Sequence, residues 1–323
     1  MSRSGRPELR GARVLVTGAS GFLGANLCRT LLEAGAAVHA AVRTTSDLFR
    51  LGDLGGRIVV HRFDLCDGEA TARVIRDARP GLVFHSAAHT TRHGQWTTAD
   101  VVANTVMATA RLLDALAATG CERLVHVGSS LEYGPADHPH AEDEALRPTT
   151  LRGATKAAAA MLVLQRAKEG AAPAVVVRAF SIYGPWEPGH RLVPTAIRAA
   201  FTGEVLPLTA PGLRRDYVFV DDVCDACLRA ALADGVVGEA INAGTGVQTS
   251  NEALVAEVER ATGRRVNVAA GAFPARATDR GFWAADIGKA RRLLGWAPAH
   301  DLARGLGKSV RWFEQHFAAG AGR

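Results

Sequence analysis

Aromatic side chains are scarce in this chain: Phe, Tyr and Trp together make up 6% of its 323 residues. Proteins that bind single-stranded nucleic acid stack the bases on aromatic rings, and this composition offers no such platform. The formal net charge of +6 invites a nucleic-acid hypothesis, but the arginines are scattered along the chain and are not gathered on one helix. We therefore expect no nucleic-acid partner, and we interpret the charge as a solvated basic surface with a few phosphate-binding arginines.

Cysteines and long apolar runs are also few. The five cysteines are odd in number, and Cys224 and Cys227 have no second pair to complete a metal site, so we expect reduced thiols and no metal. No apolar stretch approaches the ~20 residues of a membrane helix. Residues 1–7 lack the apolar segment of a secretory signal. We therefore expect a cytoplasmic protein with no membrane partner.

The strongest local pattern is a glycine-rich turn near the N-terminus. A β-branched run that begins at Arg13 leads into Gly18, Gly21 and Gly24, and an amphipathic helical pattern follows over residues 22–32. Such a turn brings bare backbone N–H groups and the positive end of a helix against a pyrophosphate, and glycine removes the side chains that would block the approach. The turn predicts a dinucleotide site, although by itself it also fits an ordinary strand-to-helix connection.

Apolar strand-like runs alternate with helical patterns through the first half of the chain, without hairpin signals between them. This order favours a parallel sheet wound on both faces by helices, with ligands at the carboxyl ends of the strands. From Gly184 onward prolines are frequent and the strand patterns, at 216–220 and 239–243, become short, which favours a smaller α/β lobe over the mouth of the sheet. After the first run, those that predict the large sheet are 37–43, 58–64, 81–86, 123–129 and 174–181.

Nine short motifs then occur in one order, at 17–24, 64–65, 85–88, 104, 128–134, 183–185, 215–223, 276 with 279, and 286 followed by 294–298. Through them the chain resembles the extended short-chain dehydrogenase/reductases, in their NAD(P)-dependent nucleotide-sugar epimerase, dehydratase and ketoreductase branch. The resemblance runs from about Val14 to Phe317 and implies a doubly wound parallel Rossmann sheet with a smaller C-terminal α/β substrate lobe. We expect a flexible basic tail at 1–12, an NAD(P)-binding Rossmann domain at 13–183 with returning segments, and a mainly substrate-binding lobe at 184–323.

The resemblance assigns a set of cofactor contacts, and the residues after the second strand bear on which cofactor binds. A carboxylate there holds the adenosine ribose of NAD, but this chain has Val42 at that place, followed by Arg43. A cation suits a 2′-phosphate better than a diol, so we favour NADP over NAD, with stacking of Arg43 on adenine as the alternative. The implied cofactor residues are Gly18, Ser20, Gly21, Phe22, Leu23, Gly24, Arg43, Asp64, Leu65, Ala87, Ala88, Asn104 and Lys156.

A nucleoside-diphosphate sugar is the substrate that the resemblance implies. Planar guanidinium groups such as those of Arg215 and Arg276 bind phosphate oxygens through two hydrogen bonds, and surface ion pairs are their alternative role. Ser181 stands where many relatives carry an asparagine that binds the diphosphate, which weakens any inference about the nucleotide. The implied substrate-binding residues are His89, Ser130, Ser181, Arg215 and Arg276.

A serine or threonine, a tyrosine and a lysine act on the sugar carbinol in this family. Ser129 and Lys156 match the serine and the lysine. The tyrosine belongs four residues before the lysine, one helical turn away, and Arg152 holds that position. Arginine stays protonated at any working pH, so it can bind an oxyanion or a phosphate but cannot exchange the proton. The catalytic residues that we assign are Ser129, Lys156, Arg152 and Glu132.

Three interpretations of Arg152 remain open. In the first, another group or a water relays the proton, with Glu132, His89, Tyr133 or Lys156 as candidates. In the second, the fold binds cofactor and sugar nucleotide but its chemistry is slow or altered. In the third, the protein is a catalytically silent binding or cofactor-sensing protein. We favour the first, because the other cofactor and substrate motifs are in place.

The segment after Ser129 bears on the type of reaction. Dehydratase relatives carry an acidic pair directly after the catalytic hydroxyl residue, and here Ser130 and Leu131 stand there, which disfavours 4,6-dehydration. We predict a nucleotide-sugar epimerase or 4-ketoreductase. Alanine-rich helical patterns at 104–118 and 155–165 have small faces that permit close helix contact, so we also expect a homodimer, with packing inside one chain as the alternative.

Overall fold

The computed structural model describes residues 9–89, 96–273 and 282–318. Its strands are β1 (Arg13–Thr17), β2 (Ala37–Val42), β3 (Ile58–Arg62), β4 (Leu82–His85), β5 (Arg123–Ser129), β6 (Ala174–Ala179), β7 (Ser181–Tyr183), β8 (Leu206–Thr209), β9 (Arg214–Arg215), β10 (Tyr217–Phe219), β11 (Ala240–Ala243), β12 (Thr249–Ser250) and β13 (Val268–Phe273). Its helices are α1 (Phe22–Glu33), α2 (Gly68–Ala78), α3 (Thr98–Val102), α4 (Ala108–Thr119), α5 (Leu151–Lys168), α6 (Leu192–Thr202), α7 (Val220–Leu232), α8 (Asn251–Thr262), α9 (Gly288–Leu294) and α10 (Leu302–Ala318), with short turns of helix at η1 (Phe49–Leu54), η2 (Ala103–Met107) and η3 (Ser130–Glu132).

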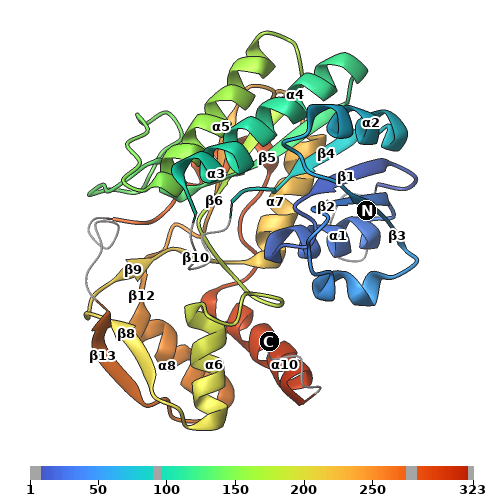
Figure 1. The fold of residues 1–323 in the computed structure, drawn as a ribbon. Helices are drawn as coiled ribbons and strands as arrows, with labels where there is room; N and C mark the ends of the chain where they lie inside the picture. The colour runs from blue at the N-terminus through green and yellow to red at the C-terminus, as the bar shows by residue number, and fades with distance from the viewer. Residues whose placement is uncertain (1–8, 90–95, 274–281, 319–323) are drawn as a thin grey trace.

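A seven-stranded parallel sheet forms the large lobe, with the strand order β11-β6-β5-β4-β1-β2-β3. The chain starts in the middle of the sheet, winds outward to β3, and then returns past β1 to the other edge, which is the doubly wound arrangement. Helices α2, α4 and α5 cover one face of the sheet, and α1 and α7 cover the other (Figure 1). The predicted fold class is confirmed, and the carboxyl ends of the strands lie along one edge.

Burial on both faces explains the apolar character of the strands. In β1, Val14 and Val16 point into the core beneath α1 and α7, whereas Leu15 points into the core on the side of α2, α4 and α5. All three side chains are fully buried. A strand covered on both faces reads as a continuous apolar run. Arg178 is the exception in β6, because it is a buried cation within an otherwise apolar strand.

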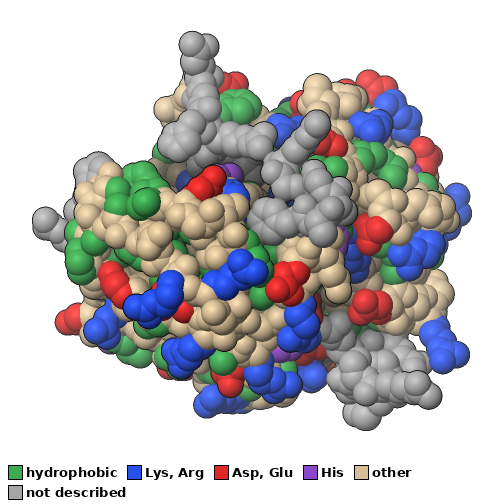
Figure 2. All heavy atoms as spheres, turned by 90° about the horizontal axis from the view of Figure 1, so that it is seen from below, with side chains coloured by type: hydrophobic (Ala, Val, Ile, Leu, Met, Phe, Trp, Pro, Cys, Tyr) green, Lys and Arg blue, Asp and Glu red, His purple; other side chains and the backbone are tan. Residues whose placement is uncertain are grey.

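The smaller lobe contains α6, α8 and α10 and the strand pairs β8 with β13 and β9 with β12. Its core gathers Val193, Ile197, Leu254 and Val258 around Phe219. Figure 2 views this end of the molecule, where Lys and Arg side chains are interspersed with Asp and Glu. The smaller lobe thus has an apolar core of its own beneath a surface of mixed charge.

Two expected boundaries need correction. The strand expected at 239–243 in the smaller lobe is β11, which pairs with β6 in the large sheet because all four of its residues are buried. The helix before it, α7, packs against α1. Residues 9–12 of the expected tail are fixed, since Leu9 is buried and its N–H donates to the carbonyl oxygen of Ala34 at 2.7 Å. Residues 1–8 lie outside the described residues.

A third correction concerns the expectation that no apolar stretch is as long as a membrane helix. The continuous helix Thr98–Thr119, which joins α3, η2 and α4, is long and apolar enough to cross a membrane by length and composition, with a mean hydropathy of 1.3. Leu112 and Leu116 on its inner side are buried in the core of the large lobe. The apolar length is therefore used in packing against the sheet. Its π turn η2 contains Asn104, whose amide nitrogen donates to the carbonyl oxygen of Asp100 at 2.8 Å.

The five cysteines are free thiols, as the sequence predicts. Cys28, Cys224 and Cys227 are buried, and Cys66 and Cys121 are half-buried. Burial raises the pKa of the Cys28 thiol to about 12, which keeps it protonated and unreactive at neutral pH. Within the described ranges, no group of three or more His, Cys, Asp or Glu side chains is arranged to hold a metal ion.

Candidate active site

The glycine turn between β1 and α1 is closed tightly around its own backbone. Gly18 has a left-handed φ of 66°, and a Cβ on it would lie 2.8 Å from the backbone of Ala87. A Cβ on Gly24 would overlap the carbonyl oxygen of Gly18. Gly21 begins α1 without a side-chain cap, so no side chain of the cap residue covers the first N–H groups of that helix. This cradle fits the pyrophosphate of a dinucleotide, which needs backbone N–H groups and no intervening side chain.

The carboxyl edge of the sheet collects the other cofactor residues that the sequence analysis assigned. Arg43 follows β2, Asp64 and Leu65 follow β3, and Ala87 and Ala88 follow β4. Parallel register aligns these strand ends side by side, so residues far apart in the chain meet at one edge. Of the remainder, Ser20, Phe22 and Leu23 lie in the glycine turn or the first turn of α1, Asn104 lies in η2, and Arg276 falls outside the described residues.

Lys156 lies beneath this edge on α5. Its side chain is buried, and its Nζ donates to the carbonyl oxygen of Val127 in β5 at 2.7 Å. The pKa of Lys156 is lowered to about 8, mainly by burial; the Glu132 charge opposes this change and the Arg152 charge adds to it. Ser129, two residues beyond Val127, ends the same strand. The lysine and the serine assigned from the sequence are therefore brought together by α5 and β5.

Arg152 lies in the first turn of the same helix, after the N-cap Thr150, whose hydroxyl accepts from the N–H of Gly153. Its guanidinium is exposed to solvent, yet the protein around it lowers its pKa, and the charge of Arg191 acts in the same direction. Within the described part of the chain, Arg152 has no hydrogen bond or ion pair from its side chain.

Glu132 is held in a buried ion pair. One carboxylate oxygen accepts from the N–H of Ser129 at 2.7 Å, and the other accepts from Nε of Arg178 at 2.8 Å. Burial raises the pKa of Glu132, and Arg178 opposes that change. A Cβ on Gly128 would lie 2.6 Å from the Glu132 carboxylate, so a glycine is needed at that point of β5. The contact with the Glu132 carboxylate therefore holds the backbone of Ser129 in place.

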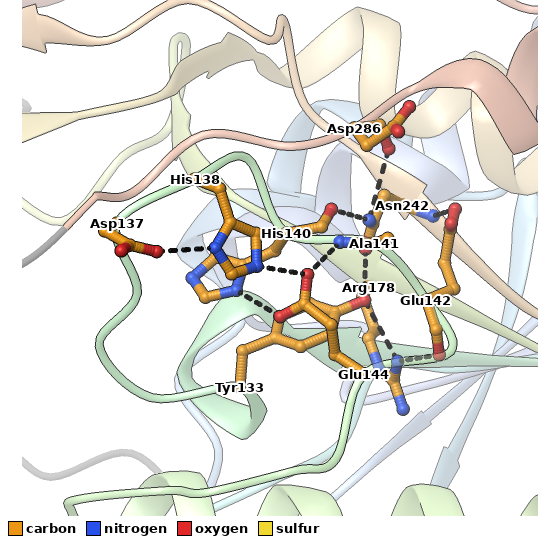
Figure 3. Close-up of polar contacts among 10 residues, drawn as sticks. All are labelled: Tyr133, Asp137, His138, His140, Ala141, Glu142, Glu144, Arg178, Asn242 and Asp286. Atoms are coloured by element: carbon orange, nitrogen blue, oxygen red, sulfur yellow. Dashed lines mark hydrogen bonds and ion pairs between the residues drawn. The ribbon is translucent and has the colours of Figure 1, made fainter.

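The hydroxyl and the ring of Tyr133 also make their contacts inside the protein (Figure 3). Its hydroxyl donates to Oδ1 of Asn242 at 2.7 Å and accepts from Nη1 of Arg178 at 3.0 Å. Its ring stacks on His140, with 4.7 Å between ring centroids, and Nδ1 of that histidine lies 3.1 Å from Glu144. The network joins the segment after Ser129 to β6 and β11. Within it, the Tyr133 hydroxyl is occupied by Asn242 and Arg178.

Comparison with known proteins identifies the family. A model described as the NAD dependent epimerase/dehydratase family matches residues 14–244. The chain belongs to this family. A dTDP-glucose 4,6-dehydratase of Streptomyces griseus is 32% identical over 314 residues, which is 94% of each chain. A UDP-glucose 4-epimerase of Mycolicibacterium smegmatis is 30% identical over 312 residues, which is 93% of this chain and 98% of the relative.

Solved structures of similar proteins cover both lobes. The epimerase Mth375 of Methanothermobacter thermautotrophicus has a TM-score of 0.87 at 27% identity, over 96% of this chain and 94% of that one. MoeE5 in complex with UDP-glucuronic acid and NAD has a TM-score of 0.83 at 31% identity, over 94% of this chain and 99% of that one. The resemblance to the nucleotide-sugar branch is confirmed. Because epimerases and dehydratases both occur among the relatives, family membership alone does not fix the reaction.

In this epimerase/dehydratase family member a buried polar layer supports the edge that carries the glycine turn. His85 is fully buried; its Nδ1 lies 2.6 Å from Oγ1 of Thr17 and its Nε2 lies 2.9 Å from Oγ1 of Thr109. Burial lowers the pKa of His85 to about 3, and the Lys156 charge acts in the same direction. The neutral ring therefore donates through one nitrogen and accepts through the other, which ties β4 to β1 and α4.

His89 lies a few residues beyond this layer. Its ring is buried and meets Trp96 edge-on, with 4.2 Å between centroids. Neither ring nitrogen has a hydrogen-bond partner within the described residues. Burial lowers the pKa of His89, and the charges of Arg43 and Arg152 lower it further. The lowered pKa favours the neutral form of the ring at pH 7.

The residues assigned to the substrate come from both lobes. Ser130 is buried in η3 of the large lobe, next to Ser129. Ser181 begins β7, and its N–H donates to the carbonyl oxygen of Asp216 at 2.9 Å. Arg215 lies on β9, and its guanidinium lies 5.3 Å from the ring centroid of Trp283. The two lobes thus contribute different parts of the candidate substrate site.

Sequence reasoning missed two charged pairs. Arg178 interrupts the apolar run of β6, and a cation inside a buried strand signals a buried partner, which is Glu132. Glu187 and Arg191 follow the Tyr-Gly-Pro motif at 183–185, and Nε of Arg191 lies 3.2 Å from the carboxylate of Glu187. The spacing of four residues between them was the available signal, but it also fits an ordinary surface pair.

Proposed function

We propose that this protein is an NAD(P)-dependent enzyme that transfers hydride at a carbinol of a nucleoside-diphosphate sugar. The reaction is either epimerisation through a transient keto sugar or reduction of a stable 4-keto sugar. The observation that carries the proposal is that the glycine turn, Ser129 and Lys156 meet at the carboxyl edge of one sheet. Relatives named as epimerases and dehydratases of nucleotide sugars support the same class of substrate.

The chain's own residues divide the work as follows. The turn at 18–24 and the N-terminus of α1 hold the pyrophosphate, and Lys156 binds the nicotinamide ribose. When bound, the nicotinamide ring supplies or accepts the hydride. Ser129 holds the carbinol oxygen of the sugar, and Arg215 binds the diphosphate from the smaller lobe. The backbone contacts of Glu132 keep Ser129 in place during this step.

Because Arg152 stands at the tyrosine position, another group must exchange the proton of the sugar carbinol. Glu132 and Tyr133 have their polar atoms occupied by Arg178, Asn242 and backbone. Burial lowers the pKa of Lys156 to about 8, near a neutral working pH, which suits proton exchange. We assign the relay to Lys156, with His89 as the second candidate because its ring is neutral.

The cofactor is NADP in this proposal, with NAD as the alternative. Arg43 is exposed at the carboxyl end of β2, and no described residue forms a hydrogen bond or ion pair with its side chain. An exposed guanidinium at this place suits a 2′-phosphate. The relative MoeE5 carries NAD in its solved complex, which favours the alternative.

A homodimer is also part of the proposal. Three apolar side chains are exposed on η2 and α5: Met107 at 44%, Met161 at 61% and Leu162 at 37% of their surfaces. Covering these side chains with a second copy would remove apolar surface from water. Light scattering on a size-exclusion column should give twice the mass of one chain, and Met161→Glu should give the mass of one chain.

Spectroscopy and turnover test the function directly. The purified protein is examined for bound nicotinamide absorbance and fluorescence, and then given NAD or NADP with a panel of sugar nucleotides. Turnover, or isotope exchange at a sugar carbon, on at least one of them is expected. Tight cofactor binding without turnover or exchange on any sugar would instead identify a catalytically silent binding protein. The arginine at position 152 is the feature that favours this alternative.

A further inference from the structure

The segment 282–286 runs beside the loop that follows η3, and backbone hydrogen bonds hold it there. The N–H of His140 donates to the carbonyl oxygen of Ala284 at 2.8 Å, and the N–H of Asp286 donates to that of His140 at 2.8 Å. Between these two bonds, His140 and Ala285 form a parallel β-bridge. The segment is therefore fixed against a loop of the large lobe.

A buried carboxylate ties the same segment to the smaller lobe. Asp216 directly follows β9, and its Oδ2 accepts from the N–H groups of Ala285 at 3.0 Å and Gly246 at 2.9 Å. Its Oδ1 accepts from the N–H and the hydroxyl of Thr245, at 2.8 Å and 2.6 Å. Leaving a buried carboxylate short of a partner is costly, so these four hydrogen bonds resist movement of the groups that make them. The residue next to Arg215 thus helps to hold the segment.

Trp283 belongs to this fixed segment and lies against the side chain of Arg215. The Trp283 side chain is buried, and Cζ of Arg215 lies over its ring, 5.3 Å from the ring centroid. The His140 ring also lies near the indole, with 5.7 Å between centroids. A guanidinium over an aromatic face is attracted by the negative charge of that face, and tryptophan gives the strongest attraction of this kind. Trp283 therefore restrains the Arg215 guanidinium.

Stacking and phosphate binding use different parts of a guanidinium. An aromatic ring contacts its flat face, whereas a phosphate accepts hydrogen bonds from the N–H groups along its edge. The indole N–H takes no part in holding Arg215, because Nε1 of Trp283 is buried and has no hydrogen-bond partner among the described residues. The contact between the two side chains is therefore made by the aromatic face, and it is compatible with a phosphate at the guanidinium edge.

We propose that Trp283 is a positioning residue, which holds Arg215 in the orientation that binds the substrate diphosphate. The inference rests on the function proposed above, in which Arg215 binds that diphosphate. A freely rotating arginine side chain loses conformational entropy when it binds a ligand, whereas a side chain that is already stacked loses less. Trp283 strengthens binding in this way without touching the substrate.

Isothermal titration of the full chain tests this role without turnover as the readout. The probes are UDP, dTDP and GDP, and the diphosphate that binds most tightly is used with the variants. Trp283→Leu should weaken its binding by about 3- to 30-fold, as expected for the loss of a cation–π contact. Trp283→Phe keeps an aromatic face and should lose less than about threefold. Arg215→Gln should weaken binding by about tenfold or more.

The double variant separates positioning from a general structural role. If Trp283 acts through Arg215, adding Trp283→Leu to Arg215→Gln should change the affinity by less than about twofold. Trp312→Leu is the matched control, since the Trp312 ring stacks on His316 of α10, with 3.9 Å between centroids. It should leave the affinity of the original protein and of Arg215→Gln unaltered. Trp283→Met takes the place of Trp283→Leu if urea unfolding shows that the leucine variant does not fold.

Two results would overturn the positioning role while the proposed function stands. One is an unchanged affinity in Trp283→Leu. The other is a loss that is equally large with and without Arg215→Gln, which would mean that Trp283 supports the site independently of Arg215. Failure of all three diphosphates to bind the original protein overturns the proposed function and the positioning role together.

Discussion

Lys156 and Arg152 lie one turn apart on α5, and the positive charge of Arg152 acts on the Lys156 ammonium in addition to the larger effect of burial. A tyrosine in place of Arg152 would remove this repulsion at neutral pH. Under the proposed function, the arginine takes the place of a proton carrier and also lowers the pKa of Lys156, to which we assign the relay. The consequences can be measured on stability, cofactor binding and specificity.

The buried lysine should make stability depend on pH. The pKa of Lys156 is about 8 in the folded protein, against about 10.4 in an unfolded chain. Between these values the unfolded state binds more protons, so the free energy of unfolding rises with pH. Below about pH 8 Lys156 is charged in the folded state, and burial of this charge lowers the free energy of unfolding by an amount of order 3 kcal/mol. Urea unfolding should give Lys156→Met a stability advantage that shrinks between pH 8 and 10; a difference independent of pH would contradict the lowered pKa.

Gly24 should not tolerate a side chain. Alanine there would press its Cβ against the carbonyl oxygen of Gly18, so Gly24→Ala should lose about 1–3 kcal/mol in urea unfolding and should bind NAD(P)H weakly in a fluorescence titration. Gly52→Ala is the control, because nothing lies within 4 Å of a Cβ on Gly52. Its stability should change by less than about 0.5 kcal/mol. Unimpaired binding by Gly24→Ala would argue against the pyrophosphate position.

Removing Arg178 alone should destabilise the protein more than removing both charges of the ion pair between Glu132 and Arg178. Arg178→Met leaves a buried carboxylate without its partner and should cost about 3–5 kcal/mol of unfolding free energy. Adding Glu132→Gln removes that unpaired charge and should restore part of the loss, as urea unfolding of the single and double variants can measure. If the two losses simply add, the side chains are not coupled as the 2.8 Å contact implies.

Arg43 should decide the choice of cofactor. The protein should bind NADPH more tightly than NADH, and Arg43→Asp should reverse the preference, because a carboxylate repels the 2′-phosphate and accepts from the ribose hydroxyl. Fluorescence titration should register a change of roughly tenfold or more in the affinity ratio. Arg57→Asp makes the same charge change at another exposed arginine and should leave the ratio unaltered. An unaltered ratio in Arg43→Asp would mean that the ribose is held by other groups.

Much of the molecule could be predicted from local patterns. The strand at 123–129 was expected and found with the same bounds, and the helix expected at 22–32 is α1, Phe22–Glu33. The glycine turn follows from the spacing of its glycines, whereas Ser129 and Lys156 are assigned from the resemblance to the family. The site residues assigned from strand ends also meet at one edge, since parallel strands place their carboxyl ends together.

What the sequence alone determined, then, is the alternation of strands and helices, the glycine turn, and an arginine four residues before Lys156, all properties of short segments. Tertiary structure decided the rest. Four buried residues of β11 fit beside β6, and Glu132 met Arg178 at a distance of 46 residues along the chain. These outcomes depend on which surfaces pack together and on which buried charges find partners, and neither is encoded in the spacing of any one segment.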